Sequence, residues 1–126
     1  DAWGVTRNLA HLAAYERRLA APVLEEIIAG RDGRAAAPSG DEDWFTRETQ
    51  ELSEQPLREI WSELRVARER QIAAVGSCSS AALNAALTPL WGGGQLQSAG
   101  WVAWKTVQHS WEHGTPIMQT ALFAPR

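Results

Sequence analysis

Hydrophobic residues that recur every three or four positions constrain this chain more than any other feature of its sequence. Such spacing places hydrophobic side chains on one face of an α-helix, and it runs through three long segments. We expect helices over about residues 5–29, 56–75 and 98–122. Alternation of apolar and polar residues, which is typical of β-strands, is not found. The sequence therefore predicts an all-α protein.

Prolines and glycines mark the boundaries and interruptions of these helices. Between them we expect two short helices, over residues 41–52 and 79–87. A loop is expected over residues 30–40 and a turn over residues 89–94. Pro22 is expected to bend the first long helix or to end it early, because proline lacks an amide hydrogen. For the same reason, Pro116 is expected to kink the last helix or to force a restart capped by Thr115.

Three long helices suggest an up-down four-helix bundle in which one helix is missing or replaced. The length of 126 residues suits a single domain over residues 1–126. A fourth helix could come from residues upstream of Asp1, from the short helices, or from a second chain in a homodimer. The sequence leaves these alternatives open.

Composition argues against several kinds of partner. The formal net charge is −3, and arginine and lysine are scattered among acidic residues, so no nucleic-acid partner is expected. No run approaches the roughly 20 apolar residues that span a bilayer, and no signal peptide is visible. Cys78 is the sole cysteine, which excludes an intrachain disulfide. We therefore expect a cytoplasmic protein that is not bound to membranes.

The three histidines of the chain are the strongest functional signal. His109 and His113 are four residues apart on the last helix, which places both rings on one face. His11 lies on the first long helix and joins them if those two helices pack side by side. Three neutral imidazoles and a water molecule would form an open metal site. The alternative is that these histidines are hydrogen-bonded core residues.

The string His109-Ser110-Trp111-Glu112-His113 also matches the H-x-x-E-H motif of inverted zinc peptidases. That motif requires a further protein ligand after the helix. The 13 residues that follow His113 contain no Asp, Glu or His, which argues against peptidase chemistry.

Two segments resemble the DinB-like superfamily of four-helix proteins. WGVTRNLAHLAAYE, residues 3–16, is similar to the segment in which a tryptophan precedes the helix with the first metal histidine. WVAWKTVQHSWEHGTPIMQTAL, residues 101–122, is similar to the last helix with its H-x3-H pair. The middle of the chain matches more loosely. Members usually have a long helix before the tryptophan segment, whereas this sequence begins there.

The resemblance implies a bundle that holds a divalent metal through His11, His109 and His113. The superfamily includes metal-dependent thiol transferases that use low-molecular-weight thiols, and relatives linked to resistance against toxic natural products. We therefore expect an enzyme that acts on a small molecule by thiol transfer or hydrolysis. Imidazole ligands favour zinc, with nickel or iron as alternatives.

Other side chains are candidates for supporting roles, and each also has an ordinary structural explanation. Glu16 and Glu112 could orient a ligand imidazole or transfer a proton, or could be surface carboxylates. Candidates for substrate contact, all of which could simply pack between helices, are Tyr15, Trp44, Trp104 and Trp111.

Two further functions remain open from the sequence. The bundle could sequester a small apolar molecule between tryptophans, or serve as a regulatory module without chemistry. Cys78 is a weak candidate nucleophile, because no histidine lies near it in the sequence and it follows an inter-helix turn.

Overall fold

The computed structural model describes residues 4–31, 33, 36, 38, 43–85 and 98–123, with the backbone alone for residues 120–123. Its helices are, in order, α1 (Val5–Tyr15), η1 (Glu16–Ala20), α2 (Ala21–Ile28), α3 (Trp44–Ser53), α4 (Leu57–Gly76), α5 (Ser80–Asn84) and α6 (Ala99–Phe123). No strand occurs among these residues, so the all-α prediction is confirmed. The expected turn at 89–94 lies outside the described residues.

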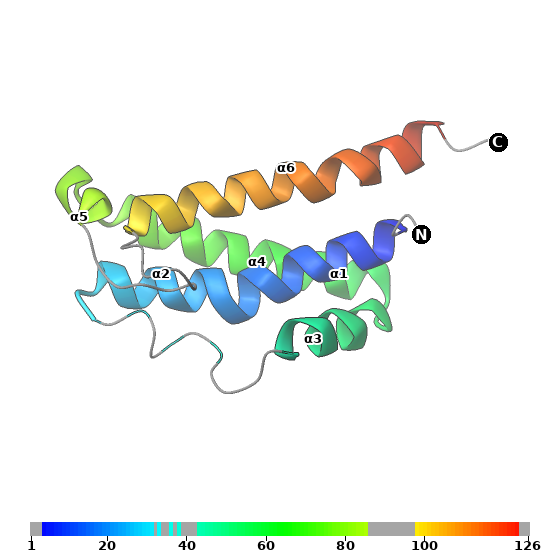
Figure 1. Cartoon of the computed structure of the whole chain (residues 1–126), viewed down its shortest axis with the longest axis horizontal. Helices are drawn as coiled ribbons and strands as arrows, with labels where there is room; N and C mark the ends of the chain where they lie inside the picture. Colours follow the sequence, from blue (N-terminus) through cyan, green and yellow to red (C-terminus); the bar gives the residue numbers. More distant parts are fainter. Residues whose placement is uncertain are drawn as a thin grey trace.

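The helices form a bundle in which α1, η1 and α2 make one continuous rod, and α4 and α6 run antiparallel to each other (Figure 1). The rod made by α1, η1 and α2 lies beside α4 and α6, while the shorter α3 packs mainly against α1. α1 and α6 are in contact, which is the arrangement that the histidine hypothesis requires.

The first long helix continues past Pro22, so of the two expected outcomes, a bend or an early end, the early end does not occur. A π-helical turn, η1, lies immediately before Pro22, and the amide of Ala21 bonds to the carbonyl of Glu16. A π-turn of this kind lets a helix continue where the regular bonding pattern is interrupted. The turn also brings Glu16 to the inside of the bundle, where it is fully buried.

The last long helix also remains unbroken. α6 runs through Gly114 and Pro116, so the restart capped by Thr115 does not occur. The hydroxyl of Thr115 instead donates to the carbonyl of Trp111, 3.0 Å away. None of the described helices combines the length and the hydropathy that crossing a membrane requires.

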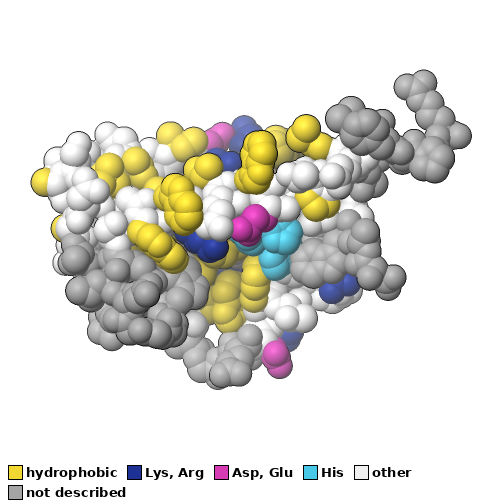
Figure 2. Space-filling model, turned by 45° about the horizontal axis from the view of Figure 1, so that its top comes forward, with side chains coloured by type: hydrophobic (Ala, Val, Ile, Leu, Met, Phe, Trp, Pro, Cys, Tyr) yellow, Lys and Arg dark blue, Asp and Glu magenta, His cyan; other side chains and the backbone are white. Residues whose placement is uncertain are grey.

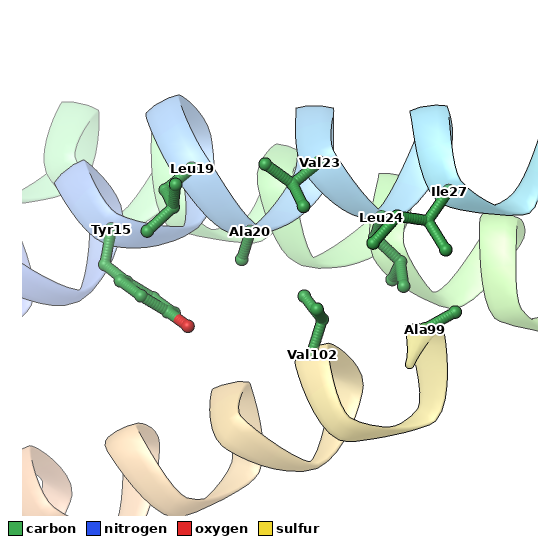
Figure 3. Close-up of a cluster of buried hydrophobic side chains, with 8 residues drawn as sticks. All are labelled: Tyr15, Leu19, Ala20, Val23, Leu24, Ile27, Ala99 and Val102. Atoms are coloured by element: carbon green, nitrogen blue, oxygen red, sulfur yellow. The ribbon is translucent and has the colours of Figure 1, made fainter. Parts of the chain in front are cut away.

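Two groups of buried hydrophobic side chains hold the bundle together. The first joins the rod to the start of α6, with Val23, Leu24 and Val102 fully buried at its centre (Figure 3). The second joins α1 to α3 and α4 through residues such as Leu12 and Ile60. Together they fix α1 against α6 and α3, the elements that surround the histidines.

A buried polar network crosses the middle of the bundle. Arg68 of α4 binds both carboxylate oxygens of Glu16, with 2.7 Å between Nε and Oε2. Gln71 donates to the same carboxylate and accepts a hydrogen bond from Thr106 of α6, each at 2.8 Å. The Arg68 guanidinium also donates to the Ser110 hydroxyl at 2.8 Å. Glu16 therefore links three elements of the bundle through partners that offset the cost of burying its charge.

Candidate metal centre

The structure brings the three histidines of the chain together. His11 comes from α1, and His109 and His113 come from successive turns of α6. The His11 ring lies 5.0 Å from that of His109 and 4.3 Å from that of His113, centroid to centroid. One ring nitrogen from each residue can be chosen so that all three lie within 4.8 Å of one another.

This spacing fits a single metal ion after a small adjustment. Zinc–nitrogen bonds of about 2.0–2.1 Å in a tetrahedral site place the nitrogens about 3.3 Å apart. The largest separation of 4.8 Å therefore needs to shrink by about 1.5 Å or less. Rotation of the imidazole rings can supply such a movement, so the three side chains could hold an ion.

Burial keeps the imidazoles in the neutral form that binds metals. The pKa of His11 is lowered to about 4, mainly by desolvation and in addition by the neighbouring His113 and Arg7. The pKa of His109 is likewise lowered to about 3, mainly by desolvation and in addition by repulsion from His113, His11 and Lys105. The pKa of His113 is also lowered by desolvation, although Glu112 opposes the shift. Near neutral pH, protons therefore compete weakly for these nitrogens.

Asn8 orients one of the rings, and the sequence reasoning missed it. Its side-chain amide donates to the carbonyl of Gly4 at 3.1 Å, which leaves its oxygen as the acceptor for Nδ1 of His113 at 3.0 Å. Nδ1 then carries the proton, and the lone pair sits on Nε2, where it can bind a metal. Asn8 is buried and precedes His11 by three residues on the same helix, a spacing that could have indicated it.

Nδ1 of His109 and the hydroxyl of Tyr15 are buried and have no hydrogen-bond partner among the described residues. The two rings pack edge to face with their centroids 4.5 Å apart. Buried polar groups are usually paired, so such exceptions mark places where something from outside is bound. Burial also raises the pKa of Tyr15, so the phenol stays protonated and can donate a hydrogen bond.

Aromatic side chains cover the centre on the α3 side. The ring of Phe45 lies 4.2 Å from that of His11, and Trp44 packs on Phe45 at 5.1 Å. Figure 2 shows histidine side chains at the molecular surface, next to an acidic side chain and above hydrophobic ones. The centre is thus open to solvent on one face and apolar beneath.

The two predicted carboxylates have different surroundings. Glu16 is fully buried, which excludes the surface position considered for it, and it bonds to Arg68 and Gln71 rather than to an imidazole. Glu112 is exposed and accepts a hydrogen bond from Gln108 at 2.8 Å. Its charge still acts on His113, so Glu112 is the carboxylate that stays near the centre.

The tryptophans divide in the same way. Trp44 is half-buried beside Phe45, close to the histidines. The structure does not bring Trp104 and Trp111 to the centre: their side chains are 57% and 79% exposed. Trp111 lies two residues from His109, which turns it about 200° around the helix axis to the opposite face of α6.

Cys78, the weak candidate nucleophile, is half-buried, and its thiol bonds to the carbonyl of Val75 at 3.2 Å.

Fold and site together define an all-α bundle in which three convergent histidines could hold a metal ion between helices. The family model described as the DinB superfamily matches residues 1–117. The chain belongs to the DinB superfamily, as its two terminal segments predict. No curated protein and no solved structure matches it significantly.

Proposed function

We propose that the protein is a metal-dependent enzyme that acts on a small molecule by thiol transfer or hydrolysis. The observation that carries the proposal is the set of three nitrogens, from His11, His109 and His113, within 4.8 Å of one another. Three imidazole ligands leave a coordination position open, and such sites in proteins are catalytic more often than structural. We propose zinc as the ion, with nickel or iron also suited to imidazole.

A divalent ion in this position would lower the pKa of a bound thiol or water so that it is nucleophilic near neutral pH. Asn8 holds the His113 ring in the tautomer that binds. Tyr15, whose buried hydroxyl has no partner in the described part of the chain, donates a hydrogen bond to the substrate. Glu112, exposed at the rim, exchanges protons with solvent. Phe45 excludes water on the α3 side of the centre.

Cobalt(II) substitution tests the open position. Untagged protein loaded with cobalt should bind one ion, and 2-mercaptoethanol should add a sulfur-to-cobalt charge-transfer band in the near ultraviolet. The Cys78→Ser variant should show the same band, because the sulfur comes from the added thiol. Folded protein that binds no cobalt would contradict the proposal. A cobalt spectrum that the added thiol leaves unchanged would contradict it too.

A second candidate function rests on a separate groove. Val107, Trp111 and Met118 line an apolar groove of about 530 Å³ on the face of α6 turned away from His109. A groove of this size can hold a drug-sized apolar molecule, which suits a sequestration protein. Binding of apolar dyes by metal-free protein, lost in Trp111→Ala and retained in His109→Ala, would favour this function. The cytoplasmic location and a homodimer remain predictions.

A further inference from the structure

The outward face of α6 carries large apolar side chains at a regular spacing. Trp104, Trp111 and Met118 recur every seven residues, and Val107 and Gly114 lie between them at intervals of three and four. This heptad pattern is typical of a helix that packs lengthwise against another helix. We call these five residues the α6 stripe. Its four side chains are between 57% and 79% exposed, so the described helices leave the stripe uncovered, and Figure 2 shows hydrophobic side chains at the surface over α6.

The apolar surface continues from the stripe onto α4. Val107 forms part of the groove of about 530 Å³ that runs along the stripe, and also part of a second groove of about 370 Å³ between α4 and α6. Ile72 of α4 lines that second groove and is 64% exposed. The two grooves therefore form one apolar surface across two helices.

The area of this surface suits a protein partner. Roughly 500 Å² of apolar surface is exposed by Ile72 and the four side chains of the stripe. A standard interface buries about 800 Å² on each partner, of which about 450–500 Å² is apolar. The surface thus supplies the apolar share of one complete side of an interface.

Gly114 leaves room for a side chain from another molecule. It lies inside α6, where glycine is less favourable than alanine. A Cβ atom at this position would meet no atom of the described chain within 4 Å, so packing inside the chain does not require glycine. Gly114 instead widens the groove between Trp111 and Met118. A bulky side chain can enter there, as a knob enters a hole in a coiled coil.

Trp111 is the bulky side chain that the stripe itself offers. It is the most exposed large hydrophobic residue in the described part of the chain, and it stands about one turn before Gly114. When two copies pair about a two-fold axis that passes between these positions, each Trp111 faces the hollow at Gly114 of the other copy. A single surface thus carries both the knob and the hole.

The residues beside the stripe do not oppose the approach of an identical chain. Charges at the positions that flank a heptad seam determine which partner a helix accepts. Here these positions are uncharged, namely Ala103, Gln108, Ser110, Thr115 and Ile117. Two copies therefore meet without placing like charges opposite each other, whereas a charged partner would find no opposite charge.

We propose that the protein forms a two-fold symmetric dimer through the α6 stripe, with Trp111 of each copy packed on Gly114 of the other. The dimer goes beyond the proposed function and does not depend on a bound metal. Because His109 lies on the opposite face of α6 from Trp111, the interface leaves both histidine centres accessible.

Sedimentation equilibrium of the full, untagged and metal-free chain measures the association. At about 100 µM protein we expect twice the chain mass of 13.8 kDa, because interfaces of standard size have dissociation constants of about 1 µM or below. Dilution should shift the mass towards that of a single chain.

Matched variants locate the interface. Val107→Glu places an unpaired charge in the stripe and should raise the dissociation constant about a hundredfold or more. Val66→Glu introduces the same charge at another exposed valine, on α4. Val66 lies six residues from Ile72, which turns it about 120° around α4, so this variant should leave association unchanged.

Gly114→Leu tests the packing of the knob in the hole. The added side chain starts from a Cβ with no close neighbour in the described chain and replaces a glycine inside a helix, so the helix content measured by circular dichroism should not fall. It occupies the place of Trp111 from the other copy, so the dissociation constant should rise about tenfold or more.

Each alternative occupant of the surface gives a different result. Protein that stays monomeric at all concentrations would overturn the proposal, and apolar dyes bound through Trp111 of that monomer would assign the groove to a small molecule. A dimer that Val107→Glu and Gly114→Leu leave intact would show that another surface pairs, and would also overturn it. Because metal-free protein is used, these outcomes are independent of whether the histidines bind zinc.

Discussion

Two buried polar clusters lie one helical turn apart in this bundle and differ in how completely their hydrogen bonds are satisfied. Around Glu16, the carboxylate, the Arg68 guanidinium and the Gln71 amide all bond to one another or to Thr106. Around the histidines, polar atoms of Tyr15, Thr49 and His109 are buried with no partner among the described residues. The first cluster is complete within the protein, and the second is not.

The difference teaches which cluster stabilises the fold and which receives something from outside. A satisfied network fixes its helices, whereas loss of one member leaves the others buried and unpaired. Unsatisfied groups cost stability in the unliganded protein and become useful only when a ligand or ion reaches them. We therefore expect changes in the Glu16 network to affect folding and changes around the histidines to affect binding.

Replacement of Glu16 should have the largest effect on folding. Glu16→Ala leaves the half-buried Arg68 guanidinium without its carboxylate, and removal of one partner of a buried pair costs about 3 kcal/mol in the free energy of unfolding. Urea unfolding at pH 7 measures this loss. Glu59→Ala, in the exposed pair with Arg58, should change stability by about 0.5 kcal/mol or less. Equal effects of the two variants would contradict the role of the network.

Removal of Asn8 should affect metal binding more than folding. Asn8→Ala takes away the acceptor that holds Nδ1 of His113, and loss of such a partner typically weakens metal affinity by about 10–100-fold. Competition with a zinc-binding dye measures the affinity. Asn8→Asp keeps an acceptor for Nδ1 of His113 and should retain most of the zinc affinity. If Asn8→Asp instead binds zinc as weakly as Asn8→Ala, the hydrogen bond to His113 is not the cause of the loss.

Thr106 in the Glu16 cluster and Thr49 beside the histidines allow the two clusters to be compared through the same type of residue. Thr106→Val leaves the Gln71 oxygen unpaired in a buried site, and we expect a loss of about 1–2 kcal/mol in the free energy of unfolding. Thr49→Val removes a hydroxyl that bonds to none of the described residues and should be neutral or stabilising by about 1 kcal/mol or less. Thermal unfolding of the two variants side by side gives the answer, and a marked loss for Thr49→Val would place that hydroxyl in the folding network.

Acid should destabilise the metal-free protein through the histidines. Their pKa values are lowered from 6.5 to about 4 for His11 and about 3 for His109, so between these values the unfolded chain binds more protons than the folded one. Stability from this source is complete above pH 6.5 and decreases as the pH falls towards 4. Urea midpoints at pH 7 and pH 5 should differ less in His109→Gln than in the unaltered protein. An equal difference would indicate that other groups cause the loss.

Much of the fold follows from the sequence, because helical periodicity and helix-breaking residues are local signals. The spacing of hydrophobic residues predicts the three long helices, and the four-residue interval between His109 and His113 predicts that they share a face. The convergence of His11 on that pair depends on packing between α1 and α6, and the resemblance of both terminal segments to one superfamily supplied it.

The rest depends on contacts that no local pattern contains. The π-turn before Pro22 keeps the helix intact and places Glu16 in the core, where a pattern-based interpretation saw a candidate catalytic or surface carboxylate. Asn8 and Phe45 acquire their roles from rings more than 30 residues away in the chain. Trp111 lies away from the histidine centre because its position on α6 faces the opposite side of the helix.

The most direct test of the account is the zinc content of untagged protein, measured by elemental analysis after equilibration with a small excess of zinc and removal of unbound ions. We predict about one zinc per chain, with less than a tenth of that in His109→Ala and in the triple variant that also lacks His11 and His113. Folded protein without zinc, or zinc retained by the triple variant, would contradict the claim that these three imidazoles form a metal centre.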